Sequence, residues 1–115
     1  MGIGKDGHIA FDFPGDVLHA TTHIERLPDS IFSSKKGLFG GDNEVPVAAV
    51  TIGMNVVLHA RKIILMVNDS SKKAAVQMLL ERSEVTPRLP ASILWLHNDV
   101  TLIMTRESCP FALRK

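Results

Sequence analysis

Residues 62–67, a lysine followed by five apolar residues, limit the possible folds more than any other part of the chain, and the apolar run ends at Asn68-Asp69. A short apolar run closed by turn-forming residues is typical of a buried β-strand. Asp69 or Ser70 can cap a helix through about Arg82, in which apolar residues recur at helical spacing. A strand followed directly by an amphipathic helix is typical of α/β folds, so this segment predicts a sheet with parallel pairing.

The remaining segments extend this into an alternating pattern. Strands are predicted at 23–27, 47–52 and 100–105, short helices at 55–60 and 91–97, and a loop with one helical turn at 28–43. Because residues 47–52 are a continuous run of small, mainly apolar side chains, they predict a strand buried on both faces. The first fifteen residues hold four of the eight glycines and predict a loop. The predicted fold class is α/β, with a partial Rossmann-like (doubly wound) parallel sheet.

Composition narrows the class of protein. A chain of 115 residues with 45% hydrophobic residues predicts one globular domain, residues 1–115. The net charge of +1 gives no indication of nucleic acid or of a membrane surface as a partner. The longest uncharged stretch, residues 45–60, is too short to span a bilayer. A single cysteine, Cys109, excludes an intrachain disulfide and fits the reducing cytoplasm, which is the predicted location.

Residues 2–7 match the pattern Gly-x-Gly-x-x-Gly, which admits three interpretations. A dinucleotide site needs a strand before this pattern and a helix after it; the sequence predicts neither, although Glu25 has suitable spacing for a ribose-binding acid. The second interpretation is a tight turn with glycines at positive φ. The third involves Asp6 and His8, because an aspartate two residues before a histidine can orient the imidazole for proton transfer.

The sequence Gly-Ile-Gly-Lys-Asp-Gly-His-Ile-Ala-Phe, residues 2–11, resembles the signature of the glucosamine-6-phosphate deaminase/isomerase family. That family shares its fold with the 6-phosphogluconolactonases. The similarity continues through Val45-Pro46, Thr51-Ile52-Gly53, Lys72 and residues 90–97. It covers nearly all of this chain but only about the C-terminal half of a family member. It therefore implies a truncated domain, the C-terminal portion of the sugar-phosphate isomerase/deaminase fold.

The resemblance implies roles for individual residues. His8 matches the catalytic histidine that opens the sugar ring, and Asp6 matches the acid that pairs with it. Phe13 stands where the family has a glutamate, one residue after Asp12. Lys72 matches the lysine that holds the sugar phosphate. Lys36 is a weaker candidate for a second phosphate contact.

Three functions remain open from the sequence. The first is amino-sugar-phosphate deamination and isomerisation, inactive in this chain alone because the base that abstracts the C2 proton belongs to the family's N-terminal half. The others are 6-phosphogluconolactone hydrolysis, suggested by Phe13-Pro14-Gly15, and a non-catalytic sugar-phosphate-binding module. The expected partners are a hexosamine or hexose 6-phosphate, and a second copy of the chain or a complementing N-terminal half. Neither a cofactor nor a metal motif is indicated, although His19 and His23 have i, i+4 spacing.

Overall fold

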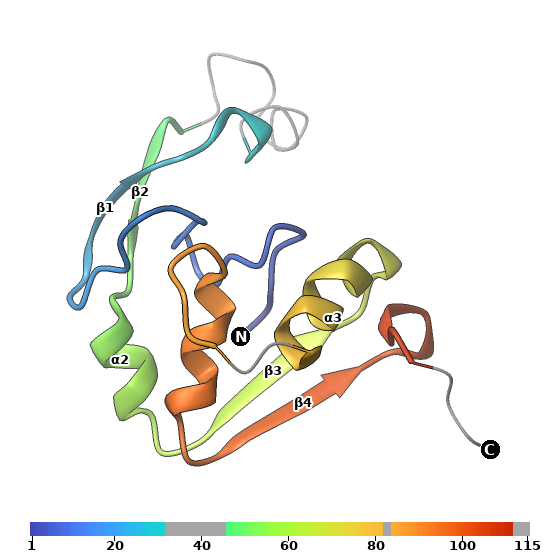
Figure 1. The fold of residues 1–115 in the computed structure, drawn as a ribbon. Helices are drawn as coiled ribbons and strands as arrows, with labels where there is room; N and C mark the ends of the chain where they lie inside the picture. The colour runs from blue at the N-terminus through green and yellow to red at the C-terminus, as the bar shows by residue number, and fades with distance from the viewer. Residues whose placement is uncertain (32–45, 82–83, 112–115) are drawn as a thin grey trace.

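The computed structural model describes residues 1–31, 46–81 and 84–111. The strands are β1 (His23–Arg26), β2 (Ala48–Thr51), β3 (Ile63–Val67) and β4 (Val100–Met104). The helices are α2 (Met54–His59) and α3 (Lys73–Glu81), and the 3-10 helices are η3 (Ser70–Lys72), η4 (Pro90–Leu96) and η5 (Arg106–Ser108). Figure 1 shows α3 in front of the β3–β4 pair, with the β1–β2 hairpin arching away from it.

Strands β3 and β4 pair in parallel, as their apolar pattern predicts, with Leu65 opposite Leu102. The first residue of the chain extends this sheet. The Met1 amino group donates to the Ile64 carbonyl at 2.8 Å, and the Met66 amide donates to the Met1 carbonyl at 2.9 Å. The glycine-rich loop therefore leaves from the edge of β3, although the sequence predicts no supporting strand before it.

One face of this sheet is covered by α3 and η4. The Asp69 carboxylate accepts a hydrogen bond from the Ser71 amide and so caps η3, which leads into α3. The predicted apolar stripe of this helix is buried against the sheet at Ala75, Val76 and Leu79. Trp95 ties η4 to the same helix, because its Nε1–H donates to the Leu79 carbonyl at 3.0 Å.

The prediction that residues 47–52 form a strand buried on both faces is wrong. Strand β2 pairs antiparallel with β1, and the Val50 side chain is 69% exposed. A continuous apolar run shows that both faces of a strand are apolar, but it does not show that the same chain covers them. Parallel pairing holds for β3–β4 but not for this hairpin.

Helix α2 connects the hairpin to the sheet, and a glycine sets its position. The Met54 and Asn55 amides donate to the carbonyls of His19 and Ala20, both at 2.9 Å. The chain can come this close only because residue 53 is glycine: a Cβ there would overlap backbone atoms of Ala20 and Thr21. Within the described ranges, none of the helices has the length and apolar content needed to cross a membrane.

Candidate functional site

The glycine-rich segment folds into a closed loop that carries Asp6 and His8. Its ends meet because the Gly4 amide donates to the His8 carbonyl at 2.8 Å, and the Gly7 amide donates to the Gly4 carbonyl at 3.0 Å. Gly7 has φ +89, the conformation that favours glycine. Its carbonyl accepts from the Ala91 amide at 3.0 Å, so η4 anchors the loop from below.

Within this loop one carboxylate oxygen of Asp6 contacts two atoms of His8. The His8 ring nitrogen Nδ1 lies 2.6 Å from Asp6 Oδ1, and the His8 amide donates to the same oxygen at 3.1 Å. A carboxylate only accepts hydrogen bonds, so Nδ1 carries a proton and Nε2 of the neutral ring presents a lone pair. The His8 side chain is 19% exposed and that of Asp6 is 46% exposed. A histidine fixed in this tautomer can accept and return a proton through Nε2.

Phe13 packs against this histidine. The two ring centroids are 4.8 Å apart with the planes tilted by 54°. A phenyl ring offers neither a proton acceptor nor a negative charge to the imidazole. The neighbouring carboxylate does not replace it at His8, because Asp12 is buried and lies 3.2 Å from Nε2 of His23.

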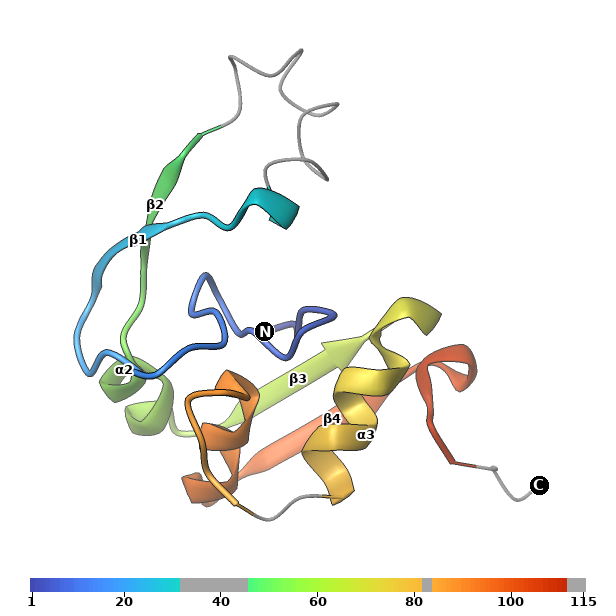
Figure 2. The ribbon, with the colours of Figure 1, turned by 45° about the horizontal axis from the view of Figure 1, so that its top comes forward.

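Lys72, the predicted phosphate-binding residue, lies in η3 at the carboxyl end of β3, where Figure 2 shows the N-terminal loop. Its charge acts on Asp69, and so does that of Lys5, which precedes Asp6 in the loop. The hydrogen bonds from Ser71 lower the Asp69 pKa most, and the two lysines lower it further. The structure therefore brings Lys5 and Lys72 to one end of the sheet. Lys36 lies outside the described residues.

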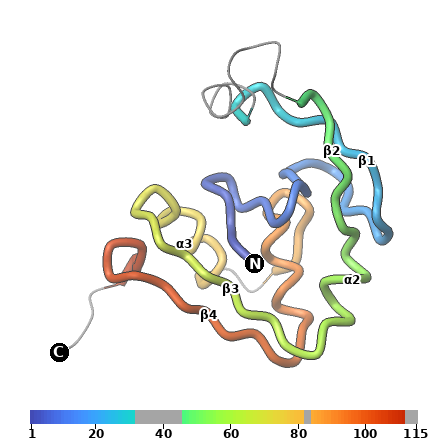
Figure 3. Tube along the Cα trace, turned by 180° about the vertical axis from the view of Figure 1, so that it is seen from behind, coloured from blue at the N-terminus to red at the C-terminus, as the bar shows by residue number. Residues whose placement is uncertain are grey.

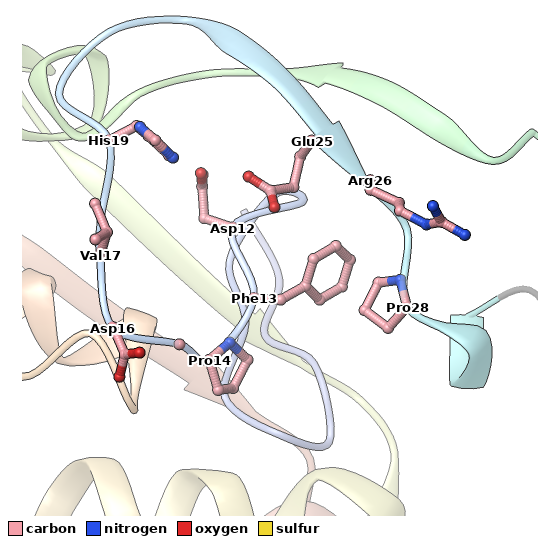
Figure 4. Close-up of a pocket in the computed structure, with 10 residues that line it drawn as sticks. Asp12, Phe13, Pro14, Asp16, Val17, His19, Glu25, Arg26 and Pro28 are labelled. Atoms are coloured by element: carbon pink, nitrogen blue, oxygen red, sulfur yellow. The ribbon is translucent and has the colours of Figure 1, made fainter.

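A second group of polar side chains lies at a pocket that Phe13 also lines. The pocket has a volume of 360 Å³ and is lined by residues 12–17, His19, the end of β1 and Pro28. Figure 4 shows the carboxylates of Asp12 and Glu25 facing each other, with the His19 ring turned toward them. Burial raises the Asp12 pKa above its usual value, although the charge of His23 opposes this shift.

The sequence carries a signal for this group in strand β1. Residues two apart in a strand share a face, so a strand at 23–26 places His23 and Glu25 together. The i, i+4 spacing of His19 and His23 would bring the two side chains together on a helix, but neither residue is helical here. The turn before β1 instead folds His19 back, with the two imidazole centroids 4.3 Å apart.

The sequence profile of the glucosamine-6-phosphate isomerases and 6-phosphogluconolactonases matches residues 1–103. The glucosamine-6-phosphate deaminase of Bacillus pumilus is 38% identical over 108 residues, which are 94% of this chain and 44% of that protein. The enzyme of the same name from Lachnoclostridium phytofermentans is 42% identical over 107 residues, covering 93% and 45%.

Two solved structures share the fold. A monomeric glucosamine-6-phosphate deaminase matches with a TM-score of 0.85 and 36% identity, covering 93% of this chain and 44% of that one. The 6-phosphogluconolactonase from Trypanosoma cruzi matches with a TM-score of 0.65 and 23% identity, covering 93% and 37%. The predicted α/β class, as a portion of a larger fold, is confirmed. The chain spans less than half the length of these relatives.

Proposed function

Because this chain belongs to the family of glucosamine-6-phosphate isomerases and 6-phosphogluconolactonases, we propose that it carries the ring-opening half of an amino-sugar-phosphate deaminase site. The observation that carries the proposal is that Asp6 contacts both Nδ1 and the main-chain amide of His8. That contact leaves His8 Nε2 as a proton acceptor in the loop at the end of the sheet. The substrate in this proposal is glucosamine 6-phosphate.

In the proposed reaction, Nε2 of His8 takes the proton from the anomeric hydroxyl and returns it to the ring oxygen. The C1–O5 bond breaks and the open-chain aldehyde forms. Asp6 stabilises the imidazolium between the two transfers, because its carboxylate already accepts the Nδ1 proton. Proton transfer by a positioned side chain contributes about 10²–10⁴-fold to such a step.

The phosphate is assigned to the cationic end of the sheet. Lys72 is half-buried in η3, and Lys5 acts on the same carboxylate, Asp69. Two ammonium groups at one end of a parallel sheet favour a dianion there, because ligands bind outside the carboxyl ends of the strands. Lys36 stays a proposed second phosphate contact.

Complete deamination requires more than these residues. Phe13 occupies the position expected for a carboxylate beside His8, and the base for C2 is not assigned to this chain. We therefore expect ring opening without ammonia release, unless a complementing N-terminal half or a second copy of the chain adds the missing groups. The proposed location of this chemistry is the cytoplasm.

The test uses ring opening itself. A residue that opens and closes the ring also interconverts the α and β anomers, which exchange NMR spectroscopy of glucosamine 6-phosphate measures directly. We expect the full chain to accelerate this exchange, and His8→Ala and Asp6→Asn to slow it. His59→Ala is the matched control, because His59 is exposed on α2 and its ring contacts the Asn55 carbonyl of the same helix. Exchange that does not change in His8→Ala would contradict the proposal.

Lactone hydrolysis is the second candidate, and the Phe13 contact favours it. Water activation on a lactone needs His8 as a base but no second carboxylate against its ring, so Phe13 is compatible with it. Hydrolysis of 6-phosphogluconolactone that is lost in His8→Ala, without any anomer exchange, would establish this alternative. Binding of either sugar phosphate without turnover would instead establish a non-catalytic binding module.

A further inference from the structure

Strand β1 directs His23 and Glu25 inward, and Ile24 and Arg26 outward. The Ile24 side chain is 75% exposed, whereas those of His23 and Glu25 are 14% and 32% exposed. This is the reverse of the usual pattern for a strand with one solvated face. The protected face of β1 therefore holds side chains that bind polar or ionic partners.

The hydrogen bonds of His23 define which of its ring nitrogens is available. Nδ1 lies 2.8 Å from the Thr21 carbonyl, which only accepts, so Nδ1 carries the proton. Nε2 lies 3.2 Å from Asp12 Oδ1 and 3.2 Å from Glu25 Oε2. Neither carboxylate contact has hydrogen-bond geometry, and among the described residues this buried Nε2 has no hydrogen-bond partner.

Asp12 carries a second buried atom without a hydrogen-bond partner among the described residues. Its side chain is 3% exposed, and its Oδ2 atom also has no hydrogen-bond partner in the described part of the chain. A buried carboxylate oxygen without a partner is costly unless a cation satisfies it. The unpartnered atoms are thus Nε2 of His23 and Oδ2 of Asp12, on two side chains whose Nε2 and Oδ1 atoms lie 3.2 Å apart.

His19 completes the group. One donor atom from each of His19, His23 and Glu25 lies within 4.8 Å of the other two. The backbone of His19 is held in place, because its carbonyl accepts from the Met54 amide at 2.9 Å. Figure 4 shows its ring directed toward the carboxylates of Asp12 and Glu25.

We propose that His19, His23 and Glu25, with Asp12 as a fourth ligand, bind one divalent first-row transition-metal ion of the Zn²⁺ type. Two imidazoles and two carboxylates match the ligands that Zn²⁺ takes, whereas Mg²⁺ and Ca²⁺ prefer oxygen alone. Zinc bonds of about 2.0–2.1 Å place tetrahedral ligands roughly 3.3 Å apart, close to the His23 contacts. The Nδ1–H of His23 bonded to a carbonyl is the arrangement that orients metal-ligating histidines.

This site would differ in role from the Asp6–His8 pair. Its ligands come from residues 12–19, at Asp12 and His19, and from β1, so a bound ion links these two segments. It shares no residue with the proposed ring-opening site, and its test does not depend on that function. The competing arrangement is a His23 imidazolium paired with the two carboxylates, which needs no metal.

The test is titration of the full chain, dialysed against a chelator, with Zn²⁺ alone by isothermal calorimetry. We expect one Zn²⁺ per chain and a higher Tm at saturation, because the ion binds the folded state. His19→Ala and His23→Ala should each weaken binding at least about tenfold, and His59→Ala should not. Co²⁺ in place of Zn²⁺ should give the intense visible absorption of a four-coordinate site.

Each outcome decides between the two arrangements. If a histidine variant fails to fold, Glu25→Gln tests the same ligand set with nearly unchanged shape, and circular dichroism checks its fold. Absence of Zn²⁺ binding would overturn the proposal in favour of the imidazolium ion pair. Binding that His59→Ala weakens as much as His23→Ala would overturn it as well, because the ion would then be held by surface histidines.

Discussion

The His8 ring lies directly over the α-carbon of Gly4. A Cβ on residue 4 would overlap the Nδ1 and Cε1 atoms of the imidazole, the same nitrogen that contacts Asp6. Both partners in this arrangement are buried or half-buried in one closed loop. The glycine at this position therefore sets the place of the ring on which the proposed chemistry depends.

Gly4→Ala should displace the His8 imidazole and break its 2.6 Å contact with Asp6. We expect anomer exchange of glucosamine 6-phosphate to fall toward the level of His8→Ala, and the His8 ring signals to shift in NMR spectra. Gly2→Ala is the matched control, because a Cβ there would meet only the Met66 carbonyl oxygen at 3.9 Å. Equal activity in the two variants would contradict this role of Gly4.

The loop and the sheet were predictable from sequence to different degrees. The β3–α3–β4 order follows from residues 62–67 and the helical stripe after them, because both patterns are strong and local. The predicted helix over 70–82 begins instead with the 3-10 turn η3, and α3 is described as far as Glu81. The residue at which this helix begins depends on the capping hydrogen bond of Asp69 rather than on the spacing of the apolar residues.

Local sequence patterns do not predict the β1–β2 hairpin or the grouping of Asp12, His19, His23 and Glu25. Antiparallel pairing of β2 with β1 depends on where the chain turns, which apolar composition does not encode. The convergence of Asp12 with His23 depends on a hydrogen bond between distant segments: the Phe11 amide donates to the Thr51 hydroxyl at 3.0 Å and brings the loop against β2. A contact between residues 40 positions apart in the sequence cannot be recognised in a short motif.

Gly53→Ala should lower both the stability of the fold and the Zn²⁺ affinity of the proposed metal site. The new Cβ would overlap backbone atoms, which cannot rotate away, so we expect a loss of stability on the order of 1–3 kcal/mol. Because the shift moves the carbonyl of His19 away from Met54, Zn²⁺ affinity should fall too. Urea unfolding followed by Trp95 fluorescence and calorimetry measure the two effects. Gly15→Ala, whose Cβ would lie 3.9 Å from the Phe13 carbonyl oxygen, should change neither.

Asp69 should make stability depend on pH in the acid range. Its pKa is lowered from 3.8 in the folded chain by the Ser71 hydrogen bonds, so the carboxylate stabilises the fold above that value. That contribution disappears as the pH falls through the lower folded pKa. Asp69→Asn keeps a capping oxygen but does not titrate. Between about pH 5 and pH 3 its free energy of unfolding should therefore fall less than that of the wild type. Parallel curves from urea titrations of the two proteins would contradict this assignment.

The uncovered face of the β3–β4 sheet predicts self-association. In β3 and β4 the outward apolar side chains are Ile64, Met66 and Ile103, which are 42%, 59% and 53% exposed. Figure 3 shows this side of the strands from behind, with α3 on the opposite side. Because a contiguous apolar surface on a sheet favours association, the chain should form larger species as its concentration rises.

Met66→Lys should suppress this association, because it places a charge in the middle of the apolar row on an already exposed side chain. The helix contacts on the other face of the sheet should keep the variant folded, since Leu65 and Val67 remain buried there. Met78→Lys adds the same charge on α3, at a side chain 37% exposed, and should leave association unchanged. Sedimentation velocity over a concentration series separates the cases. A wild-type chain that stays monomeric throughout, or an equal effect of both lysines, would show that this face does not drive assembly.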